Sequence, residues 1–487
     1  MTQSYVLAYD LGTSGAKCVL VSQAGGLIAS ATASYPLYTA PGNHAEQEPA
    51  DYWRAVCATT HEVLEVSGIA PNQVAGIAFG TLWKGIIPID RTGKVLRRSI
   101  LWLDGRAGEQ AKALNDHLGK RRFAATDYWP KLYWLRQHEP EIIENAEMIL
   151  EVNAYLKWMA TGVASVDISN SYVHSFDPEQ DAFYEELFTF MDIPREKFPA
   201  YCNSWDKVGT LTQTAASQLG LVSGIPVFGG NNDIQGVSVG SGCAEIGDVH
   251  VYFGSSGWMG FAVPHNNVFT TSPFDTQRDI FMSGMKSVGL TVNWLARNLY
   301  GAEYARLGDG VFKLMDEEAA QVAAGSDGLL ATPWLYGENQ PQATLDCCGS
   351  FWNLRQTHTR GHMMRAMLES ICFHLKYRTQ YFCGLSGYQW PERVRAVGGG
   401  ACSDVWMQIL ADVLNMPVEV PVACRHAGAI GTAYSAIVGL GYAKDLTEAA
   451  GRLELQKTYY PDPENTATYE SRFAAYCKLC EIMKSLC

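Results

Sequence analysis

The stretch that decides the fold lies near the middle of the chain, where residues 228–236 read FGGNNDIQG. The apolar run Ile225–Phe228 leads into it and predicts a short buried strand. Two glycines then allow a sharp turn or the close approach of a ligand to the backbone. Asp233 is the single acid of the stretch, and a lone carboxylate is costly to bury unless a polar group meets it. Asp233 therefore either caps a turn or helix, or it is a general base that faces a substrate hydroxyl.

Length and composition limit the class of protein. The chain has 487 residues, which is too long for one ordinary core, so we expect two domains. Apolar residues make up 47% and charged residues 18%, which is typical of a globular protein. The net charge of −13 disfavours a nucleic-acid partner, because such binding usually needs a basic excess.

Cysteine usage predicts a cytoplasmic protein. The 13 cysteines are scattered and odd in number, unlike a secreted disulfide framework. We expect no signal peptide after Met1, and no membrane partner, because no uncharged apolar run reaches about 20 residues. Cys477 and Cys480 form a CxxC pair, which one face of a C-terminal helix explains better than zinc or redox chemistry.

A glycine turn near the N-terminus has the chemistry of a phosphate site. Residues 10–17 read DLGTSGAK and lie between two predicted strands. The amides of such a turn, with the hydroxyls of Thr13 and Ser14, can cradle phosphate oxygens. Asp10 at the strand end could hold Mg²⁺ through water. The spacing of a Walker loop is absent, and an ordinary glycine hairpin is the alternative interpretation.

Two later turns extend this pattern. A predicted strand at 249–253 leads into GSSG at 254–257, which repeats the first hairpin and suggests a duplicated architecture. Another predicted strand, 394–397, leads into the triple glycine 398–400 and a helix, which can place backbone beside a nucleotide. The spacing of a Rossmann fingerprint fails here, because Ser403 stands where the last glycine should be.

Other segments supply candidate ligands and helices. Asp104 and Arg106 follow an apolar run and form either a surface ion pair or a pair that hydrogen-bonds a polyol. Helices are predicted at 107–118, 131–138, 290–299 and 359–381, and a helix of small residues that permits close packing is predicted at 427–433.

Together, and in this order, these motifs resemble the FGGY carbohydrate kinases, most closely the xylulokinase branch. The resemblance runs from Tyr5 to about Leu440 and also rests on 100–106, 130–134, 138–141, 333–338 and 365–369, which read ILWLDGR, PKLYW, HEPE, PWLYGE and RAMLE. It implies an α/β fold of two actin-like (ribonuclease-H-like) ATPase lobes with a central cleft. We expect residues 1–244 to carry the sugar site and the catalytic base, and residues 245–487 to bind the nucleotide.

The resemblance also implies roles for individual residues. Asp233 is expected to be the catalytic base and, with Asp10, to lie at the Mg²⁺ site. ATP is expected to contact Thr13, Ser14, Lys17, Gly254, Ser255, Ser256, Gly399, Gly400, Ala401 and Ser403. The sugar is expected to contact Trp83, Lys84, Asp104, Arg106, Asn232 and Asp233.

The chain departs from the xylulokinase pattern on the sugar side. Family members often carry Gln-Met-His before the glycine corresponding to Gly85, where this chain has Leu-Trp-Lys at 82–84. Ile234 follows the expected base, where Asn is common, and residues 337–341 read GENQP in place of GERTP. The alternative for Lys84 is a solvated loop charge.

The sequence therefore favours an ATP-dependent sugar kinase whose acceptor is a small sugar, most simply a ketopentose such as xylulose. The alternatives are a kinase for another ketose or a polyol, an actin-like ATPase without a sugar acceptor, and a catalytically silent regulatory relative. The expected partners are the sugar and ATP, and a homodimer is left open.

Overall fold

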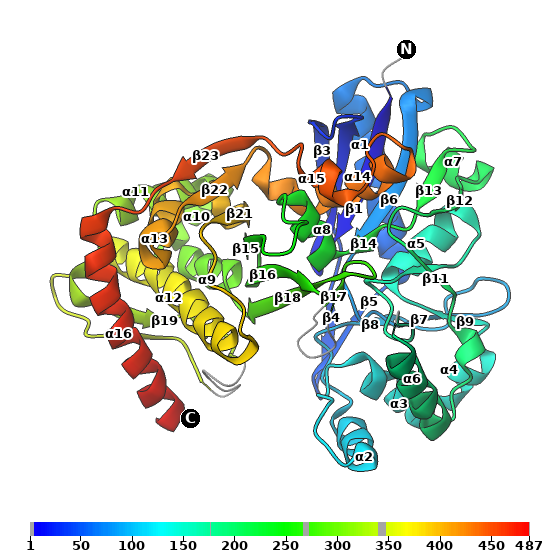
Figure 1. Ribbon diagram of the computed structural model, residues 1–487, viewed down its shortest axis with the longest axis horizontal. Helices are drawn as coiled ribbons and strands as arrows, with labels where there is room; N and C mark the ends of the chain where they lie inside the picture. Colours follow the sequence, from blue (N-terminus) through cyan, green and yellow to red (C-terminus); the bar gives the residue numbers. More distant parts are fainter. Residues whose placement is uncertain (1–3, 176, 266–271, 339–346, 487) are drawn as a thin grey trace. The chain divides into compact units, whose positions relative to one another are not determined.

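The chain folds into two α/β units (Figure 1), which a computed structural model describes for residues 4–175, 177–265, 272–338 and 347–486. The first unit consists of Met1–Gly240, Ser272–Asp279 and Gly428–Arg452, and the second of Ser241–Thr271, Ile280–Ala427 and Leu453–Cys487. The predicted class of two α/β lobes is confirmed. The expected division into 1–244 and 245–487 does not include the two later segments that return to the first unit.

The first unit is built on a sheet in which β12, β13, β6, β1, β2 and β3 are neighbours in that order, with β14 paired to β6. These strands are β1 (Tyr5–Leu11), β2 (Gly15–Ser22), β3 (Leu27–Ser34), β6 (Val74–Thr81), β12 (Lys207–Thr210), β13 (Pro226–Phe228) and β14 (Asn231–Asn232). Strand β1 runs antiparallel to β2 and parallel to β6. The glycine turn at 12–14 therefore joins a hairpin, as the sequence predicts.

Helices cover this sheet and extend the unit. They are α1 (Pro49–Ser67), α2 (Gly108–Leu118), α3 (Tyr128–His138), α4 (Pro140–Asn145), α5 (Val152–Thr161), α6 (Pro178–Met191), α7 (Gln213–Leu219), α8 (Asp233–Gly240), α14 (Ala427–Gly439) and α15 (Leu446–Ala450). The short strands are β4 (Tyr38–Ala40), β5 (His44–Gln47), β7 (Ile87–Ile89), β8 (Ser99–Ile100), β9 (Met148–Leu150), β10 (Val166–Asp167), β11 (Tyr201–Cys202) and β17 (Ser272–Pro273).

Among the residues that the structure describes, two hydrophobic clusters stabilise the first unit. One lies between the sheet and its helices, where the Tyr9 and Thr60 hydroxyls are 2.7 Å apart and join β1 to α1. The other is rich in aromatic rings, with Trp129 of α3 packed against Phe188 of α6 at a centroid distance of 4.9 Å. The second cluster gives the part of the unit beyond the main sheet a hydrophobic core of its own.

The second unit repeats the pairing pattern of the first. Its main sheet has the order β18, β16, β15, β21, β22 and β23, and β15 runs antiparallel to β16 and parallel to β21. The strands are β15 (Val249–Phe253), β16 (Gly257–Pro264), β18 (Arg278–Met285), β19 (Leu330–Thr332), β20 (Ser350–Trp352), β21 (Val394–Gly398), β22 (Val418–Pro421) and β23 (Leu455–Tyr459). Strands β15, β16 and β21 thus match β1, β2 and β6, which agrees with the suggested duplication.

The helices of the second unit are α9 (Gly289–Leu299), α10 (Gly301–Leu307), α11 (Val311–Ala320), α12 (Arg360–Ser386), α13 (Asp404–Leu414) and α16 (Pro463–Leu486). The four helices predicted from periodicity, at 107–118, 131–138, 290–299 and 359–381, correspond to α2, α3, α9 and α12. Cys477 and Cys480 both lie in helix α16, as expected. Among the residues that the structure describes, no group of three or more His, Cys, Asp or Glu side chains could hold a metal ion.

The small residues of α14 bring it into backbone contact with α8 of the same unit. A Cβ atom added at Gly431 would overlap the carbonyl oxygen of Gly236, and one at Gly428 would lie 2.9 Å from Oδ2 of Asp10. The Thr432 hydroxyl donates to Oδ1 of Asn231 at 2.8 Å. The predicted close packing of 427–433 is confirmed, and it fixes the start of α8 against the end of β1.

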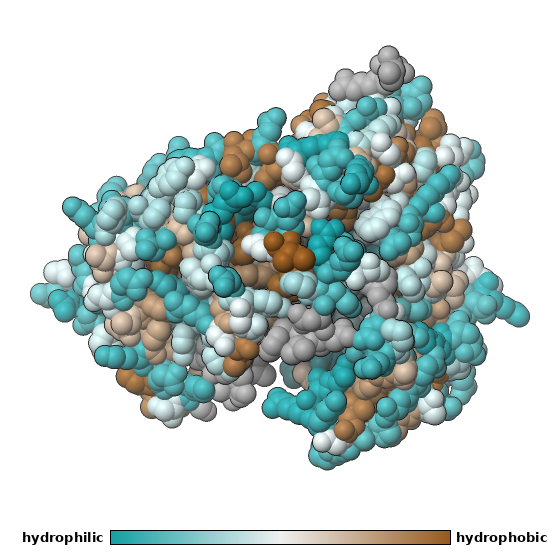
Figure 2. All heavy atoms as spheres, viewed as in Figure 1, coloured by the Kyte–Doolittle hydropathy of each residue, from teal (hydrophilic) through white to brown (hydrophobic). Residues whose placement is uncertain are grey.

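In the described ranges, no helix has both the length and the apolar character to cross a membrane. Hydrophilic residues cover most of the face in Figure 2, with hydrophobic residues in small groups among them.

The contact between α8 and α14 can be tested with Gly431→Ala. We expect this variant to lower the free energy of unfolding in urea by about 1–3 kcal/mol, because the new methyl group overlaps the backbone of Gly236. The control is Gly384→Ala in α12, where an added Cβ meets no atom within 4 Å and the gain in helix propensity is up to about 1 kcal/mol. Equal stability of the two variants would contradict the contact.

Candidate active site

Asp233 begins α8, directly after the turn that follows β13. Gly230 has φ of 72°, and a Cβ there would overlap the carbonyl oxygen of Phe79, so the turn requires glycine. Asn231 and Asn232 then pair with Gly80 and Thr81 of β6. This short pairing delivers Asp233 to the N-terminus of a helix, where the helix dipole favours a carboxylate.

The Asp233 side chain is half-buried, and its environment alters its acidity. Its Oδ1 accepts the backbone N–H of Ile234 at 3.0 Å. Burial, followed by the charge of Asp10, raises the pKa of Asp233 to about 7, although the Ile234 N–H acts in the opposite direction. A carboxyl with this pKa can accept a proton at neutral pH, which is the requirement for a general base. The position at a helix start and the possible role as a base are therefore compatible.

Asn232 holds the turn before Asp233. Its Nδ2 donates to the Ser169 carbonyl at 2.7 Å and to the Ser272 hydroxyl at 2.9 Å. Its Oδ1 accepts the Gln235 N–H at 2.8 Å, and the side chain is fully buried. A sugar contact by Asn232, as the resemblance implies, would have to use the second lone pair of Oδ1 or break one of the two Nδ2 bonds.

Asp10 lies at the end of β1, with its Oδ2 3.6 Å from Nζ of Lys17 on β2. Asp10 and Asp233 repel each other electrostatically, and a divalent cation would relieve this repulsion. Because Mg²⁺ keeps several of its water ligands and needs only one or two carboxylates, this pair suits Mg²⁺. The fit rests on two carboxylates, since the described residues offer no larger cluster of ligands.

The two glycine turns expected to bind phosphate occupy equivalent positions in the sheets of the two units. In the first unit, the Gly12 N–H donates to the Gly15 carbonyl at 3.0 Å, Thr13 accepts the Trp102 indole N–H at 3.0 Å, and Ser14 is exposed. In the second unit, the Gly254 N–H donates to the Ser256 carbonyl at 3.0 Å. Each turn joins the two antiparallel strands of its unit, β1 to β2 and β15 to β16.

The triple glycine forms the turn η5 (Gly399–Cys402) after β21. Gly398 has φ of 96°, and a Cβ there would lie 2.5 Å from the Phe253 carbonyl oxygen. Gly399 is exposed, Ala401 is buried, and the Ser403 hydroxyl accepts the Trp406 N–H as the cap of α13. The exposed backbone at Gly399 could lie against a flat ligand, whereas the Ser403 hydroxyl caps helix α13.

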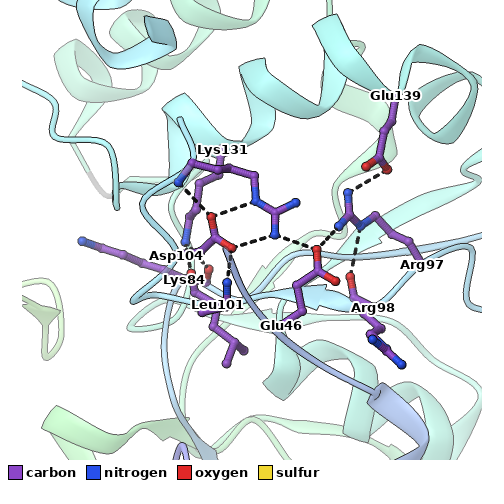
Figure 3. Close-up of polar contacts among 10 residues, drawn as sticks. Glu46, Lys84, Arg97, Arg98, Leu101, Asp104, Lys131 and Glu139 are labelled. Atoms are coloured by element: carbon purple, nitrogen blue, oxygen red, sulfur yellow. Dashed lines mark hydrogen bonds and ion pairs between the residues drawn. The ribbon is translucent and has the colours of Figure 1, made fainter. Parts of the chain in front are cut away.

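Asp104 and Arg106 form a buried ion pair, so the surface-pair interpretation is wrong. Figure 3 shows Asp104 in the same network of polar contacts as Glu46 and Arg97. Asp104 is 0% exposed and accepts the Ala45 N–H at 2.6 Å and two guanidinium N–H groups of Arg106 at 2.8 and 2.7 Å. Arg106 also donates to Glu46, which pairs with Arg97. These contacts engage both carboxylate oxygens within the protein.

Comparison with known proteins identifies the family. Residues 5–240 match the N-terminal domain, and residues 254–440 the C-terminal domain, of the FGGY family of carbohydrate kinases. The chain belongs to this family. It is therefore a carbohydrate kinase, and ATP is the nucleotide that FGGY kinases use.

Relatives of this FGGY kinase match nearly its whole length. A xylulose kinase from Staphylococcus epidermidis is 27% identical over 495 residues, which cover 98% of this chain and 96% of that protein. A gluconate kinase from Lactobacillus acidophilus has a similar fold, with a TM-score of 0.84 at 22% identity and 99% of each chain covered. A ligand-bound xylulose kinase from the same organism has a TM-score of 0.83 at 23% identity, covering 99% and 98%. The predicted actin-like two-lobe fold is confirmed.

Within this FGGY kinase, Lys84 is held in place, so the solvated-charge alternative is wrong. Its side chain is 18% exposed, and its Nζ lies 2.7 Å from Asp127 and 4.5 Å from the centre of the Trp83 ring. Lys84 also has a positive φ of 58°, which few residues other than glycine adopt. Contacts within the first unit therefore fix the position of Lys84 beside Trp83. Residues 339–341 of the other departing motif lie outside the described residues.

Two residues near this pair were missed by the sequence reasoning. Lys131 is fully buried and donates to the carbonyls of Lys84 and Leu101 at 3.0 and 2.7 Å, and burial holds the pKa of its ammonium well below the usual range. Tyr172 packs beside Trp83 with ring centres 6.2 Å apart. Burial raises the pKa of Tyr172, and Asp233 is the largest charged contributor. In the sequence, Lys131 stands out only as part of the motif PKLYW, and Tyr172 belongs to none of the motifs described above.

The Asp104–Arg106 pair can be tested by stability. Asp104→Asn is expected to lower the free energy of unfolding by about 1.5–3 kcal/mol, because it removes the charge-assisted hydrogen bonds to the buried guanidinium of Arg106 and leaves Glu46 as its remaining carboxylate partner. Asp116→Asn breaks the exposed ion pair with Lys112 and should change stability by less than about 0.5 kcal/mol. Wild-type stability in Asp104→Asn, with turnover lost, would instead assign Asp104 to the substrate.

In the absence of metal, ionisation of Asp233 should lower the free energy of unfolding. Between about pH 4 and pH 7, the unfolded chain has released the Asp233 proton while the folded protein still holds it. The free energy of unfolding of the wild type therefore falls as the pH rises through this window. Asp233→Asn should therefore exceed the wild type by about 1 kcal/mol or more at pH 8 and by less at pH 5. Urea unfolding in buffer with a chelator measures both differences, and a difference that does not grow with pH would contradict the raised pKa.

Proposed function

We propose that this chain transfers the γ-phosphoryl group of ATP to a hydroxyl of a small sugar, with a ketopentose such as xylulose as the first candidate. The observation that carries the proposal is the half-buried Asp233, whose pKa is raised to about 7 at the start of α8. The near full-length similarity to a xylulose kinase supports the choice of sugar. The scattered free thiols of the described residues support a cytoplasmic setting.

Asp233 acts in this proposal as the general base. The attacking sugar hydroxyl must lose a proton as its oxygen approaches the γ-phosphorus, and Asp233 accepts that proton. The Ile234 N–H at 3.0 Å fixes Oδ1, and the bonds of Asn232 fix the turn, so the carboxylate is oriented before the substrate arrives. Preorganisation of this kind lowers the barrier because little rearrangement is needed during the reaction.

The phosphate groups would be bound by backbone amides and hydroxyls. Thr13, Ser14 and Lys17 are the groups of the first unit for this role, and Gly254, Ser255 and Ser256 those of the second. The η5 turn, with Gly399, Gly400 and Ala401, would carry the nucleotide base or ribose. Asp10 and Asp233 are the residues that would hold Mg²⁺, which neutralises phosphate charge when it is bound.

The sugar would lie near Trp83, Lys84 and Asp233. Asp104, Arg106 and Asn232 support this region through their internal hydrogen bonds. The half-buried Lys84–Asp127 pair favours a second candidate, a kinase for another ketose or a polyol, because an ion pair beside an aromatic ring can discriminate the number and position of hydroxyl groups.

The test is ADP release from Mg-ATP with ketopentoses, hexuloses, tetritols, polyols and gluconate as acceptors. We expect one acceptor to stimulate the wild type, and Asp233→Ala to lower that stimulated rate by about a hundredfold or more, the scale of general-base catalysis. Asp116→Ala, a change of an exposed carboxylate, is the matched control and should keep the wild-type rate.

Near-normal turnover in Asp233→Ala would defeat the assignment of the base. ADP release that no acceptor stimulates, with ATP still bound, would contradict the proposed sugar acceptors and favour an ATPase.

A further inference from the structure

Two cysteines lie against each other beside the η5 turn of the second unit. Cys402 ends η5, and Cys424 begins η6 (Cys424–His426), the turn that follows β22. Their sulfur atoms are 3.6 Å apart. Because β21 and β22 are neighbouring parallel strands, their carboxyl ends meet at one edge of the sheet and bring the two turns together.

The two thiols differ in exposure and in charge environment. Cys402 is exposed, whereas Cys424 is buried. The Arg425 guanidinium donates through Nε to the Cys402 sulfur at 3.0 Å. The hydrogen bond from Cys424, together with that from Arg425, lowers the pKa of the Cys402 thiol. The hydrogen bond to the Cys402 sulfur, followed by burial, raises the pKa of Cys424. Cys402 is thus suited to react as a thiolate, with a second thiol beside it.

We propose that Cys402 and Cys424 form a reversible disulfide when a hydroperoxide is present, and that this disulfide weakens nucleotide binding. The formation of the disulfide rests on the positions and surroundings of the two thiols and does not depend on the proposed function. The second half of the proposal rests on the proposed function, in which the neighbouring Gly399, Gly400 and Ala401 bind the nucleotide.

The chemistry balances with hydrogen peroxide as the oxidant. The Cys402 thiolate attacks one peroxide oxygen, the O–O bond breaks, and hydroxide leaves to become water, which gives a sulfenic acid on Cys402. The Cys424 sulfur then attacks the Cys402 sulfur, the S–O bond breaks, and the second oxygen leaves as water. Two thiols are oxidised, and one peroxide is reduced to two waters.

Closing the bond would move the η5 turn. A disulfide needs the two sulfur atoms about 2.05 Å apart, so they must approach by about 1.5 Å from their separation in the thiol form. Cys424 is buried and Cys402 is exposed, so the displacement falls mainly on Cys402 and its turn. Gly399, Gly400 and Ala401 belong to this same turn, which is why its nucleotide contacts would change.

The experiment treats the full chain with hydrogen peroxide and maps disulfides by mass spectrometry of its peptides. We expect a linked Cys402–Cys424 peptide that dithiothreitol removes and that neither Cys402→Ser nor Cys424→Ser forms. Arg425→Gln should slow its formation, because it removes the charge that favours the Cys402 thiolate. Peroxide that oxidises the protein without giving this linked peptide would overturn the proposal.

Calorimetry with ADP tests the second half. We expect peroxide to weaken ADP binding to the wild type by about tenfold or more, and to leave the affinity of Cys424→Ser unchanged. Unchanged affinity of the disulfide form would overturn the link to nucleotide binding. A reduced wild type that binds no ADP would instead overturn the proposed nucleotide site, while the peptide mapping would still decide the thiol pair.

Discussion

The first unit depends on a helix contact that leaves no room for side chains. Helix α14 lies against α8, with Gly431 directly on the carbonyl of Gly236 and Gly428 close to the Asp10 carboxylate. Such an approach is available only to glycine, because any Cβ would meet backbone or a fixed charge. The contact draws residues 428–452, late in the chain, into the unit that carries Asp233. It thereby fixes α8, and with it Asp233, beside the end of β1.

This position places two carboxylates in one partly buried region. Asp10 and Asp233 come from the ends of different elements, and their mutual repulsion adds to the desolvation of Asp233. A structure selected only for stability would avoid this arrangement, since buried like charges destabilise the folded state. The same repulsion keeps Asp233 ready to accept a proton and creates an attractive position for a cation. Buried pairs elsewhere, such as Asp104 with Arg106, are neutralised locally and serve packing.

Much of the fold and part of the site could be predicted from the sequence. The glycine turns and the stretch FGGNNDIQG are local patterns, so Asp10, Thr13 and Asp233 could be singled out without a structure. The return of residues 428–452 to the first unit could not, because it depends on long-range packing. Asp104 and Arg106 were open to a surface interpretation because a two-residue spacing says nothing about burial. Lys131 and Tyr172 were missed because their roles arise from what surrounds them.

The central claim is that burial and Asp10 together tune Asp233 to act as a base. A carbon-13 NMR titration of the Asp233 carboxyl, in metal-free wild type and in Asp10→Asn, tests it most directly, with Asp233→Asn to assign the signal. The account predicts a midpoint at about pH 7 in the wild type and a lower midpoint in Asp10→Asn. A wild-type midpoint near the ordinary aspartate value of about 4, or one that Asp10→Asn leaves unchanged, would contradict it.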